Sequence, residues 1–486
     1  MVADAVQNAP DSRYPATALH QLPNACFWAT AGAARDLRER RQVALLRGAR
    51  VEPQDADRVV IDLALKLGRP LARLSRTDFL QDRLAAALLD KTGRPAADLT
   101  AAATRRLTDK LMAGTKPRTG CAFLHTEPHP DDLLLGCLPA IARLGQGGGN
   151  RHTFATMTSG FTAVTNDFLA GQLRDLKATV SAVQPGAIAD GGAADEARTF
   201  VRGLREGNSA LCRQAAAARL LRNVIRLGRL EGGRAVAEQV DRWLTYLDGT
   251  YAGAKDPPDV QALKGACREW ETECAWAFLG WDSPDVRHLR LAFYTGDIFT
   301  GEPERERDVP PLQELLREIR PAIISVTLDP ESSGPDTHYK VLQAVHAAVE
   351  TYVKEARADL RIWGYRNVWS RFHPAEADLI VPVSGDVLGS METAFLECFA
   401  SQRTASFPSH ELDGPFSSLA LAILREQLPG IRQCLGDEAS GSAMAAELRE
   451  AEGLLFLREM TPAEFFRASR ALRRGMEGAD AGGELP

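Results

Sequence analysis

One histidine and two carboxylates stand within four residues of one another, at His129, Asp131 and Asp132. Pro128 and Pro130 stiffen this stretch, because each proline fixes its own φ and restricts the residue before it. Zinc in hydrolases is commonly held by three histidine or carboxylate ligands, with a fourth position left for water. His129 and Asp132 are therefore candidate ligands of one metal ion. Asp131 is then free to take a proton from an attacking water.

A third ligand has to come from another loop, and His338 is the best candidate. It follows a β-branched run at Pro321–Leu328 and a turn-rich stretch that ends at Asp336. Because that run is predicted to be a strand, His338 should lie near a strand's carboxyl end. His129 follows the apolar run Cys121–Glu127 in the same way. Open α/β sheets bind their ligands at this edge, so the spacing indicates metal-assisted chemistry.

The spacing also leaves other interpretations open. Asp131 or Asp132 could cap the helix that follows, with His129 as a surface turn residue. Two histidines and one carboxylate also suit non-haem Fe(II), which would make the protein an oxygenase. His125 and His152 lie within strand patterns, where a histidine usually serves packing or a local hydrogen bond.

Strands and helices alternate in the part of the chain that holds these residues. Strands are predicted at Cys121–Glu127, Arg151–Thr158, Pro321–Leu328, Arg361–Tyr365 and Ala377–Val383. Helices are predicted from Leu133 onward, where Pro139 has to be tolerated, and at Glu314–Ile319 and Val341–Arg357. Such alternation predicts an α/β fold, with a mostly parallel sheet and helices on both faces.

Other regions are predicted to be helical throughout. Up to about Arg118, apolar residues recur at helical spacing in Asp57–Leu67, Phe79–Leu89 and Leu99–Met112. An Ala- and Arg-rich helical insertion is expected at about 166–258. Beyond about residue 440 we expect a C-terminal helix and then a disordered tail.

Composition narrows the class of protein. The 486 residues are 45% hydrophobic, which is ample for a sizeable core, and the net charge is −6 without a basic block. We therefore expect no nucleic-acid partner and no membrane span. Eight cysteines without a Cys-x-x-Cys pair, and an N-terminus without a secretory pattern, favour a reducing cytoplasm. The oligomeric state stays open, with a homo-oligomer as one option.

The motif Pro128-His-Pro-Asp-Asp132 after a strand, with a later Asp336-x-His338, resembles the LmbE/PIG-L family of zinc-dependent N-deacetylases. The resemblance runs from about 119 to 436, and it includes Arg268-Glu-Trp-Glu271 and Ser401-Gln402. It implies a Rossmann-like fold and an N-acetylglucosamine-type amino sugar or glycoconjugate as substrate. The site residues it implies are Zn²⁺ ligands His129, Asp132 and His338, general base Asp131, and Arg268 in contact with substrate or supporting the site.

A closer likeness joins the chain to bacterial proteins that carry a deacetylase-type half behind a glucosamine-6-phosphate deaminase domain. It rests on Gly334–Gln343, Arg361–Trp369 and Ala405–Ser409, and on Pro15–Asn24 and Ala33–Leu37 near the N-terminus. The likeness divides the chain into a deaminase remnant at 1–50, a helical connector at 51–118, a deacetylase-like domain at 119–440 and a tail at 441–486. We expect no deaminase activity from the remnant.

Two positions depart from the family pattern. Leu133 stands where the family has an acidic residue, and Pro335 stands where it often has a histidine that stabilises the oxyanion. Zinc itself, a protonated Asp336 in contact with substrate, His373 or a backbone N–H would then take that role. The sequence predicts a zinc-dependent hydrolase that removes an N-acetyl group from an amino sugar. The alternative is a weak or inactive sugar-binding or regulatory relative.

Overall fold

The computed structural model describes residues 2–477 except 12–14, 30–31, 33, 35, 146, 181–192, 252, 298–299, 331–334, 357–358, 369, 406–413 and 437–442. Several residues used for the resemblance therefore lie outside the described part, namely Ala33, Arg35, Gly334, Trp369 and 406–409. The expected disordered tail beyond residue 477 lies outside it as well.

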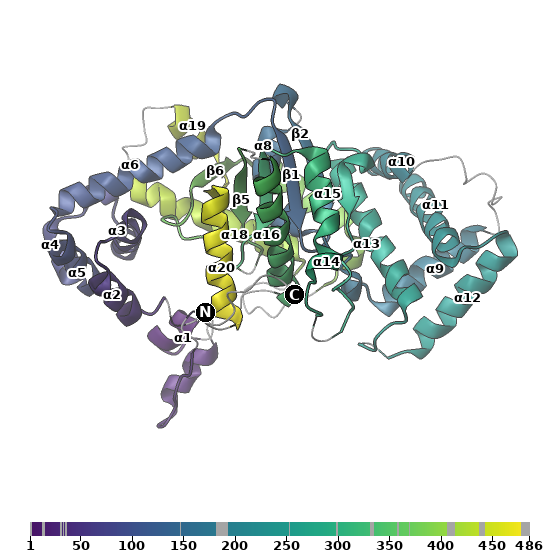
Figure 1. Cartoon of the computed structure of the whole chain (residues 1–486), viewed down its shortest axis with the longest axis horizontal. Coiled ribbons are helices and arrows are strands. Elements are labelled where there is room, and N and C mark those ends of the chain that lie inside the picture. Colours follow the sequence, from purple (N-terminus) through teal and green to yellow (C-terminus); the bar gives the residue numbers. More distant parts are fainter. Residues whose placement is uncertain are drawn as a thin grey trace.

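A seven-stranded sheet forms the centre of the molecule, in the order β3-β2-β1-β4-β5-β7-β6 (Figure 1). Its strands are β1 (Ala122–Glu127), β2 (Arg151–Thr156), β3 (Val286–His288), β4 (Ile323–Thr327), β5 (Arg361–Tyr365), β6 (Leu379–Val383) and β7 (Gly453–Met460). The pairs from β3 to β5 are all parallel, and β7 runs antiparallel to both of its neighbours, β5 and β6. The predicted α/β, Rossmann-like fold with a mostly parallel sheet is confirmed.

The sheet has a separate hydrophobic core on each face. Successive side chains of a strand point to opposite faces and therefore pack in different cores. Leu124 and Ile324 pack on one face, whereas their neighbours Phe123 and Ile323 pack on the other. The first face is covered by α15 (Pro310–Ile319), α16 (Asp336–Ala356) and α20 (Pro462–Glu477). The second is covered by α8 (Leu138–Leu144), α13 (Pro258–Phe278), α17 (Gly385–Cys398) and α18 (Phe416–Leu435). Because both faces are buried, β4 (IISVT) and β6 (LIVPV) are mainly apolar, whereas β1 and β2 carry polar residues that are buried as well.

The N-terminal region is helical, as predicted, and packs beside the edge strand β6 (Figure 1). Its helices are α1 (Val2–Gln7), α2 (Arg38–Arg47), α3 (Pro53–Leu67), α4 (Arg76–Gln81), α5 (Arg83–Thr92) and α6 (Ala96–Thr115). The predicted helix Phe79–Leu89 is two helices, because Asp82 ends α4 and caps α5 by accepting from the backbone N–H groups of Leu84 and Ala85.

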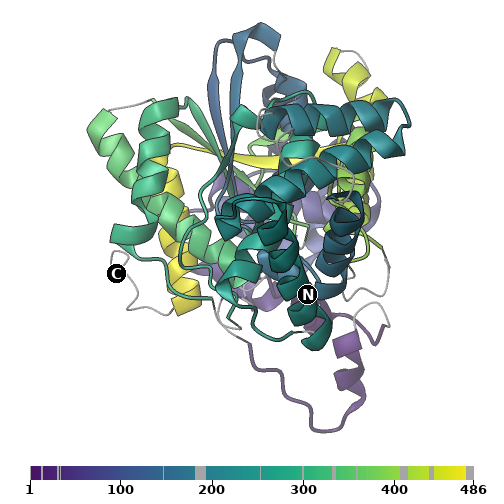
Figure 2. The ribbon, with the colours of Figure 1, turned by 90° about the vertical axis from the view of Figure 1, so that its right-hand side faces the viewer.

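The predicted insertion is a helical bundle on the opposite side of the sheet (Figures 1 and 2). It contains α9 (Asn166–Val180), α10 (Ala193–Arg205), α11 (Ser209–Gly228) and α12 (Gly233–Gly249). Leu173, Val224 and Trp243 belong to a hydrophobic core of its own. The insertion is joined to the sheet domain by α13, which continues from it along the second face.

Three details differ from the sequence-based expectation. The helix predicted from Leu133 breaks at Cys137 into α7 (Asp132–Gly136) and α8, so that Pro139 lies in the first turn of α8, where its missing N–H costs nothing. The short strand β3 was not predicted. The tail at 441–486 is not only helix and disorder, because α19 (Ala443–Glu450) is followed by β7. Strand β7 is almost fully buried and lacks the alternation that marks a strand.

Short helical segments complete the description, namely α14 (Arg305–Asp308) and the 3₁₀ turns Pro15–Gln21, Leu71–Arg73, Gly147–Gly149, Phe161–Ala163, Ser283–Asp285 and Ala400–Gln402. Within the described residues, every helix is too short or too polar to cross a bilayer. All eight cysteines are free thiols.

Candidate metal centre

The candidate ligands lie where the order of the strands reverses. From β1 the chain moves outward to β2 and β3, and from β4 it moves outward in the other direction to β5. His129 and Asp132 follow the carboxyl end of β1, and His338 lies in the first turn of α16 after β4. Because β1 and β4 are neighbours, the loops after them diverge and leave the crevice in which open α/β sheets bind ligands.

The three side chains converge on one point. Nδ1 of His129 lies 3.2 Å from Nε2 of His338 and 3.6 Å from Oδ2 of Asp132. Nε2 of His338 lies 3.4 Å from the same carboxylate oxygen. Ligand atoms about 2.0–2.1 Å from a tetrahedral ion are about 3.4 Å from one another, so this triangle has the size of one face of a zinc site. His129, Asp132 and His338 could therefore hold a metal ion.

Two further side chains orient these ligands. Oδ2 of Asp329 accepts a hydrogen bond from Nδ1 of His338 at 2.8 Å, which leaves Nε2 for a metal. Oδ1 of Asp329 accepts from the backbone N–H of Asn367 at 2.9 Å. The side-chain amide of Asn367 in turn donates to Oδ1 of Asp132. Carboxylates and amides commonly fix the orientation of metal ligands in this way.

The charges of the ligand groups suit a cation. Burial opposes ionisation of Asp132, yet His338 and His129 lower its pKa below the ordinary value. Burial lowers the pKa of His129, so its imidazole is neutral near pH 7. Burial also opposes the charged form of His338, but Asp132 and Asp329 outweigh burial and raise its pKa. Because metal and proton compete for His338, metal binding should be sensitive to pH.

Asp131 lies beside the three ligands and has an unusual backbone. Its φ is 153° and its ψ is −18°, a region that a residue with a side chain rarely adopts. Arg268 contacts both the side chain and the backbone of this loop. Its Nη2 lies 3.2 Å from Oδ2 of Asp131 and donates to the carbonyl oxygen of Pro130 at 2.7 Å. Burial raises the pKa of Asp131 to about 7, although Arg268 opposes the increase. Such a carboxyl can accept and return a proton near neutral pH.

Arg268 is itself held by a second carboxylate. It is 1% exposed, and its Nη1 lies 3.2 Å from Oε2 of Glu271. Glu271 also accepts hydrogen bonds from the backbone N–H and the hydroxyl of Ser401, at 2.6 and 2.7 Å. The Arg-x-x-Glu and Ser-Gln segments that were singled out in the sequence are thus in contact, and together they position Asp131.

Glu127 supports the loop from inside the sheet. It is the last residue of β1 and is 1% exposed. Its carboxylate accepts from the backbone N–H of Leu133 at 3.0 Å and from the hydroxyl of Thr156 at 2.7 Å. Burial raises its pKa to about 8. This residue ties the start of α7 to β1 and β2.

Two residues proposed as replacements for the missing oxyanion histidine are engaged with partners other than the three ligands. Asp336 begins α16 and is half exposed, with Oδ2 at 2.6 Å from Nζ of Lys340. Nε2 of His373 lies 3.0 Å from Oδ1 of Asp62, and its Nδ1 accepts from the backbone N–H of Ala375. Both nitrogens of His373 are therefore occupied at the contact with the N-terminal helices.

Sequence reasoning did not find Asp329, Asn367, Glu127 or Tyr294. The ring of Tyr294 meets that of His129 edge to face, with centroids 5.8 Å apart, and its hydroxyl lies 2.6 Å from Oγ1 of Thr162. Asp329 could have been found, because it is a carboxylate that directly follows a predicted strand. Asn367 and Tyr294 carry no such signal.

The histidines expected to serve packing do so. Nε2 of His125 lies 3.0 Å from Nδ1 of His152, and its Nδ1 lies 2.8 Å from the hydroxyl of Ser325. Both rings stack on Phe123.

Comparison with known proteins gives one partial similarity. No protein-family model matches the chain. A stretch of 175 residues is 30% identical to a glucosamine-6-phosphate deaminase-like protein of Bacteroides thetaiotaomicron. The match covers 35% of this chain and 26% of that relative, so the aligned part is about a quarter of the relative's length. The relative's name refers to a deaminase, so the likeness to LmbE/PIG-L deacetylases rests on the motif residues.

Proposed function

We propose that the protein is a zinc-dependent hydrolase that removes the acetyl group from an N-acetylated amino sugar. The observation that carries the proposal is the convergence of His129, Asp132 and His338 with a fourth group, Asp131, beside them. Amide hydrolysis needs a metal site that activates water and a general base beside it. The histidines and Asp132 can form the metal site, and Asp131, whose pKa lies near 7, can act as the base.

The roles of the residues follow from their positions. A bound Zn²⁺ would supply Lewis-acid chemistry, polarising the amide carbonyl and activating water. Asp131 takes a proton from the water while the water oxygen attacks the carbonyl carbon of the amide. When the carbon–nitrogen bond breaks, Asp131 gives that proton to the departing amine, so acetate and the free amino sugar are released. Arg268 holds the carboxylate of Asp131 toward the ligands and stabilises its negative charge.

Two likenesses to other proteins support an amino-sugar substrate. The B. thetaiotaomicron relative is named for similarity to an enzyme of glucosamine 6-phosphate. The motif residues resemble enzymes that act on N-acetylglucosamine-bearing substrates. We therefore propose N-acetylglucosamine, its 6-phosphate or a glycoconjugate of it as the substrate class.

The test is elemental analysis joined to a deacetylation assay on the full chain. We expect about one zinc per chain in the wild type, loss of zinc in His129→Ala, and released acetate from N-acetylglucosamine or its 6-phosphate. Asp131→Asn should keep the zinc and lose turnover by about two to four orders of magnitude. Asp109→Asn is the matched control, because Asp109 is exposed on α6.

Each contrary result has a distinct meaning. Turnover retained in Asp131→Asn would contradict the role of Asp131. Iron in place of zinc, with oxygen consumption, would favour the oxygenase. A zinc-loaded wild type that binds an amino sugar but hydrolyses no N-acetylated compound would favour the sugar-binding relative.

A further inference from the structure

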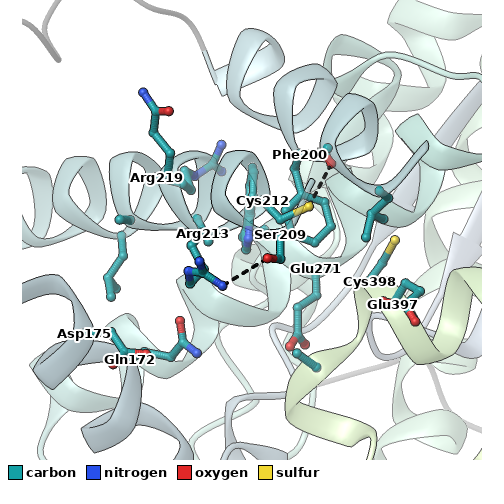
Figure 3. A pocket seen from close by; sticks show the side chains of 18 of the residues that line it. Gln172, Asp175, Phe200, Ser209, Cys212, Arg213, Arg219, Glu271, Glu397 and Cys398 are labelled. Carbon is teal, nitrogen blue, oxygen red and sulfur yellow. Dashed lines mark hydrogen bonds between the residues drawn. The ribbon is translucent and has the colours of Figure 1, made fainter. Parts of the chain in front are cut away.

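A cavity of about 930 Å³ opens between α9, α10, α11, α13 and α17 (Figure 3). Sites for small molecules commonly have about 300–1,000 Å³, so this hollow has room for one. It is separate from the metal centre. Glu271 lies on its wall, and the buried Arg268 stands between Glu271 and Asp131. A molecule in the cavity would therefore not reach the reacting atoms of the proposed hydrolysis.

Most of the cavity wall is apolar. Aromatic and aliphatic side chains from three helices of the insertion and from α13 line it, namely Phe168, Leu176, Phe200, Leu220, Trp270 and Phe278. Cys267 contributes a thiol, and burial raises its pKa to about 12, so that it stays neutral. Cys398 lies on the wall as well, and burial also raises its pKa. Such a wall binds the apolar or aromatic body of a ligand.

One polar group on this wall lacks a partner. Asn223 lies on α11, lines the cavity and is 3% exposed. Among the residues that the structure describes, nothing forms a hydrogen bond with its side-chain amide. Its amide atoms are not fully enclosed, so the amide is accessible from the cavity and keeps its donors and its acceptor for a ligand. A ligand with a carbonyl or N–H group beside its apolar body would satisfy Asn223.

The mouth of the cavity carries positive charge. Arg205 and Arg213 are exposed there, and both donate to neutral groups. Nη2 of Arg205 donates to the carbonyl oxygen of Phe278 at 3.3 Å. Nη1 of Arg213 donates to the hydroxyl of Ser209 at 3.3 Å (Figure 3). In the described part of the chain, neither guanidinium is within 4.0 Å of a carboxylate. Both keep free donors for a carboxylate or phosphate.

Three acidic residues, Asp175, Glu271 and Glu397, line the described part of the cavity, and each has an interaction of its own. Glu397 lies 3.8 Å from Nη2 of Arg403. Glu271 is paired with Arg268 and bound by Ser401. The charges of Arg205 and Arg213 therefore remain to attract an anion.

We propose that this cavity is a second binding site, which takes a small amphipathic anion. The apolar body lies against the wall, an amide-type group meets Asn223, and the anionic group stays at the mouth beside Arg205 and Arg213. The proposal does not depend on the hydrolase activity, because none of these residues belongs to the metal centre.

The test is isothermal titration of the full chain with N-decanoylglycine, which combines an alkyl chain, an amide and a carboxylate. We expect saturable binding of one molecule per chain, and weaker binding of the uncharged methyl ester. The double variant Arg205→Gln/Arg213→Gln should weaken binding of the acid about tenfold and leave the ester unchanged. Asn223→Leu should weaken both, because it removes the amide partner. Decyl phosphate, titrated in parallel, distinguishes a carboxylate site from a phosphate site.

Ala216→Trp fills the cavity from its wall and should abolish binding of every probe. The thermal midpoint shows whether each variant is folded. Absence of saturable binding in the wild type would overturn the proposal. It would also be overturned by an ester that binds as tightly as the acid, or by undiminished binding in the folded Ala216→Trp protein. If that variant does not fold, the arginine double variant, which changes only exposed side chains, decides between the outcomes.

Discussion

Asp329 accepts a hydrogen bond from Nδ1 of His338 at 2.8 Å, and this bond points the other ring nitrogen at His129 and Asp132. The same carboxylate accepts from the backbone of Asn367, whose side chain holds Asp132. Asp329 thus fixes two of the three candidate ligands at once. It orients His338 directly and Asp132 through Asn367.

We predict that Asp329→Ala weakens metal binding about 10–100-fold, because the imidazole of His338 loses both its orientation and the negative charge behind it. Competition between the protein and a zinc-chelating dye measures the change. Asp359→Asn is the control, since Asp359 is exposed before β5. Unchanged zinc affinity in a folded Asp329→Ala protein would show that Asp329 does not support the metal centre.

Part of this centre could be predicted from the sequence. Pro128 and Pro130 mark a stiff turn after an apolar strand, and His338 follows another strand, so both loops could be assigned to one edge of the sheet. The supporting residues could not be found in this way. Asn367 follows β5 and reaches Asp132 only because β5 pairs with β4. The local sequence pattern predicts individual strands but not their order in the sheet.

The same limit explains the missing strand. The run Gly453–Met460 is buried on both faces and inserts antiparallel between β5 and β6, although it follows them in the chain. An apolar run of that length fits a buried helix equally well until its neighbours are known. The cavity of the insertion likewise depends on how its helices pack, which amphipathic periodicity alone does not give.

Arg268 should influence the pKa of Asp131 and therefore the pH range in which Asp131 can act as a base. Burial raises the pKa of Asp131, and the positive charge of Arg268 counteracts part of that increase. In Arg268→Gln the carboxyl loses this stabilisation, so its pKa rises further and the base form appears only at higher pH. We expect the ascending limb of the kcat–pH profile to move to higher pH, with turnover at neutral pH about tenfold or more below wild type.

Arg268→Lys is the matched variant, because it keeps the charge and should restore much of the profile. Zinc content measured on both variants separates an effect on Asp131 from loss of the metal. A pH profile of Arg268→Gln that coincides with that of the wild type would show that Arg268 does not act through Asp131.

Gly114 should be required for the contact between α6 and β6. A Cβ at this position would lie 2.1 Å from the carbonyl oxygen of Ile380, and a strand backbone cannot move aside as a flexible side chain does. We predict that Gly114→Ala destabilises the protein by about 1–3 kcal/mol in urea unfolding. Gly389→Ala is the control, because Gly389 lies in α17 with nothing within 4 Å of its added Cβ. That change should stabilise the protein by about 0.5–1 kcal/mol. Equal effects of the two substitutions would contradict the close packing of α6 on β6.

Protonation of Glu273 should lower the stability of the protein in acid. The pH range concerned lies below 4.5, the ordinary pKa of a glutamate side chain. Arg219 donates to both of its oxygens, at 2.9 and 2.6 Å, and Nε2 of His288 lies 3.5 Å away. Burial opposes ionisation of Glu273, but these partners outweigh it and lower the pKa. The folded state therefore binds fewer protons than the unfolded state, so the pair stabilises the fold above pH 4.5 and loses that contribution as pH falls through the folded pKa.

Glu273→Gln removes the charge and leaves the buried Arg219 with only the more distant carboxylate of Glu196, at 3.9 Å. We expect a loss of about 3–5 kcal/mol near pH 7, which disappears progressively as the solution is acidified below the pKa of Glu273. Thermal unfolding of both proteins across the acidic range measures this convergence. The matched control is Glu318→Gln, because Glu318 is exposed and only 3.3 Å from the exposed Arg287, a pair that contributes little. Once Glu273 is protonated, the wild type has no salt bridge left to lose, so the two stability curves should converge in acid. Curves of thermal stability against pH that stay parallel would show that the buried pair does not set the acid sensitivity.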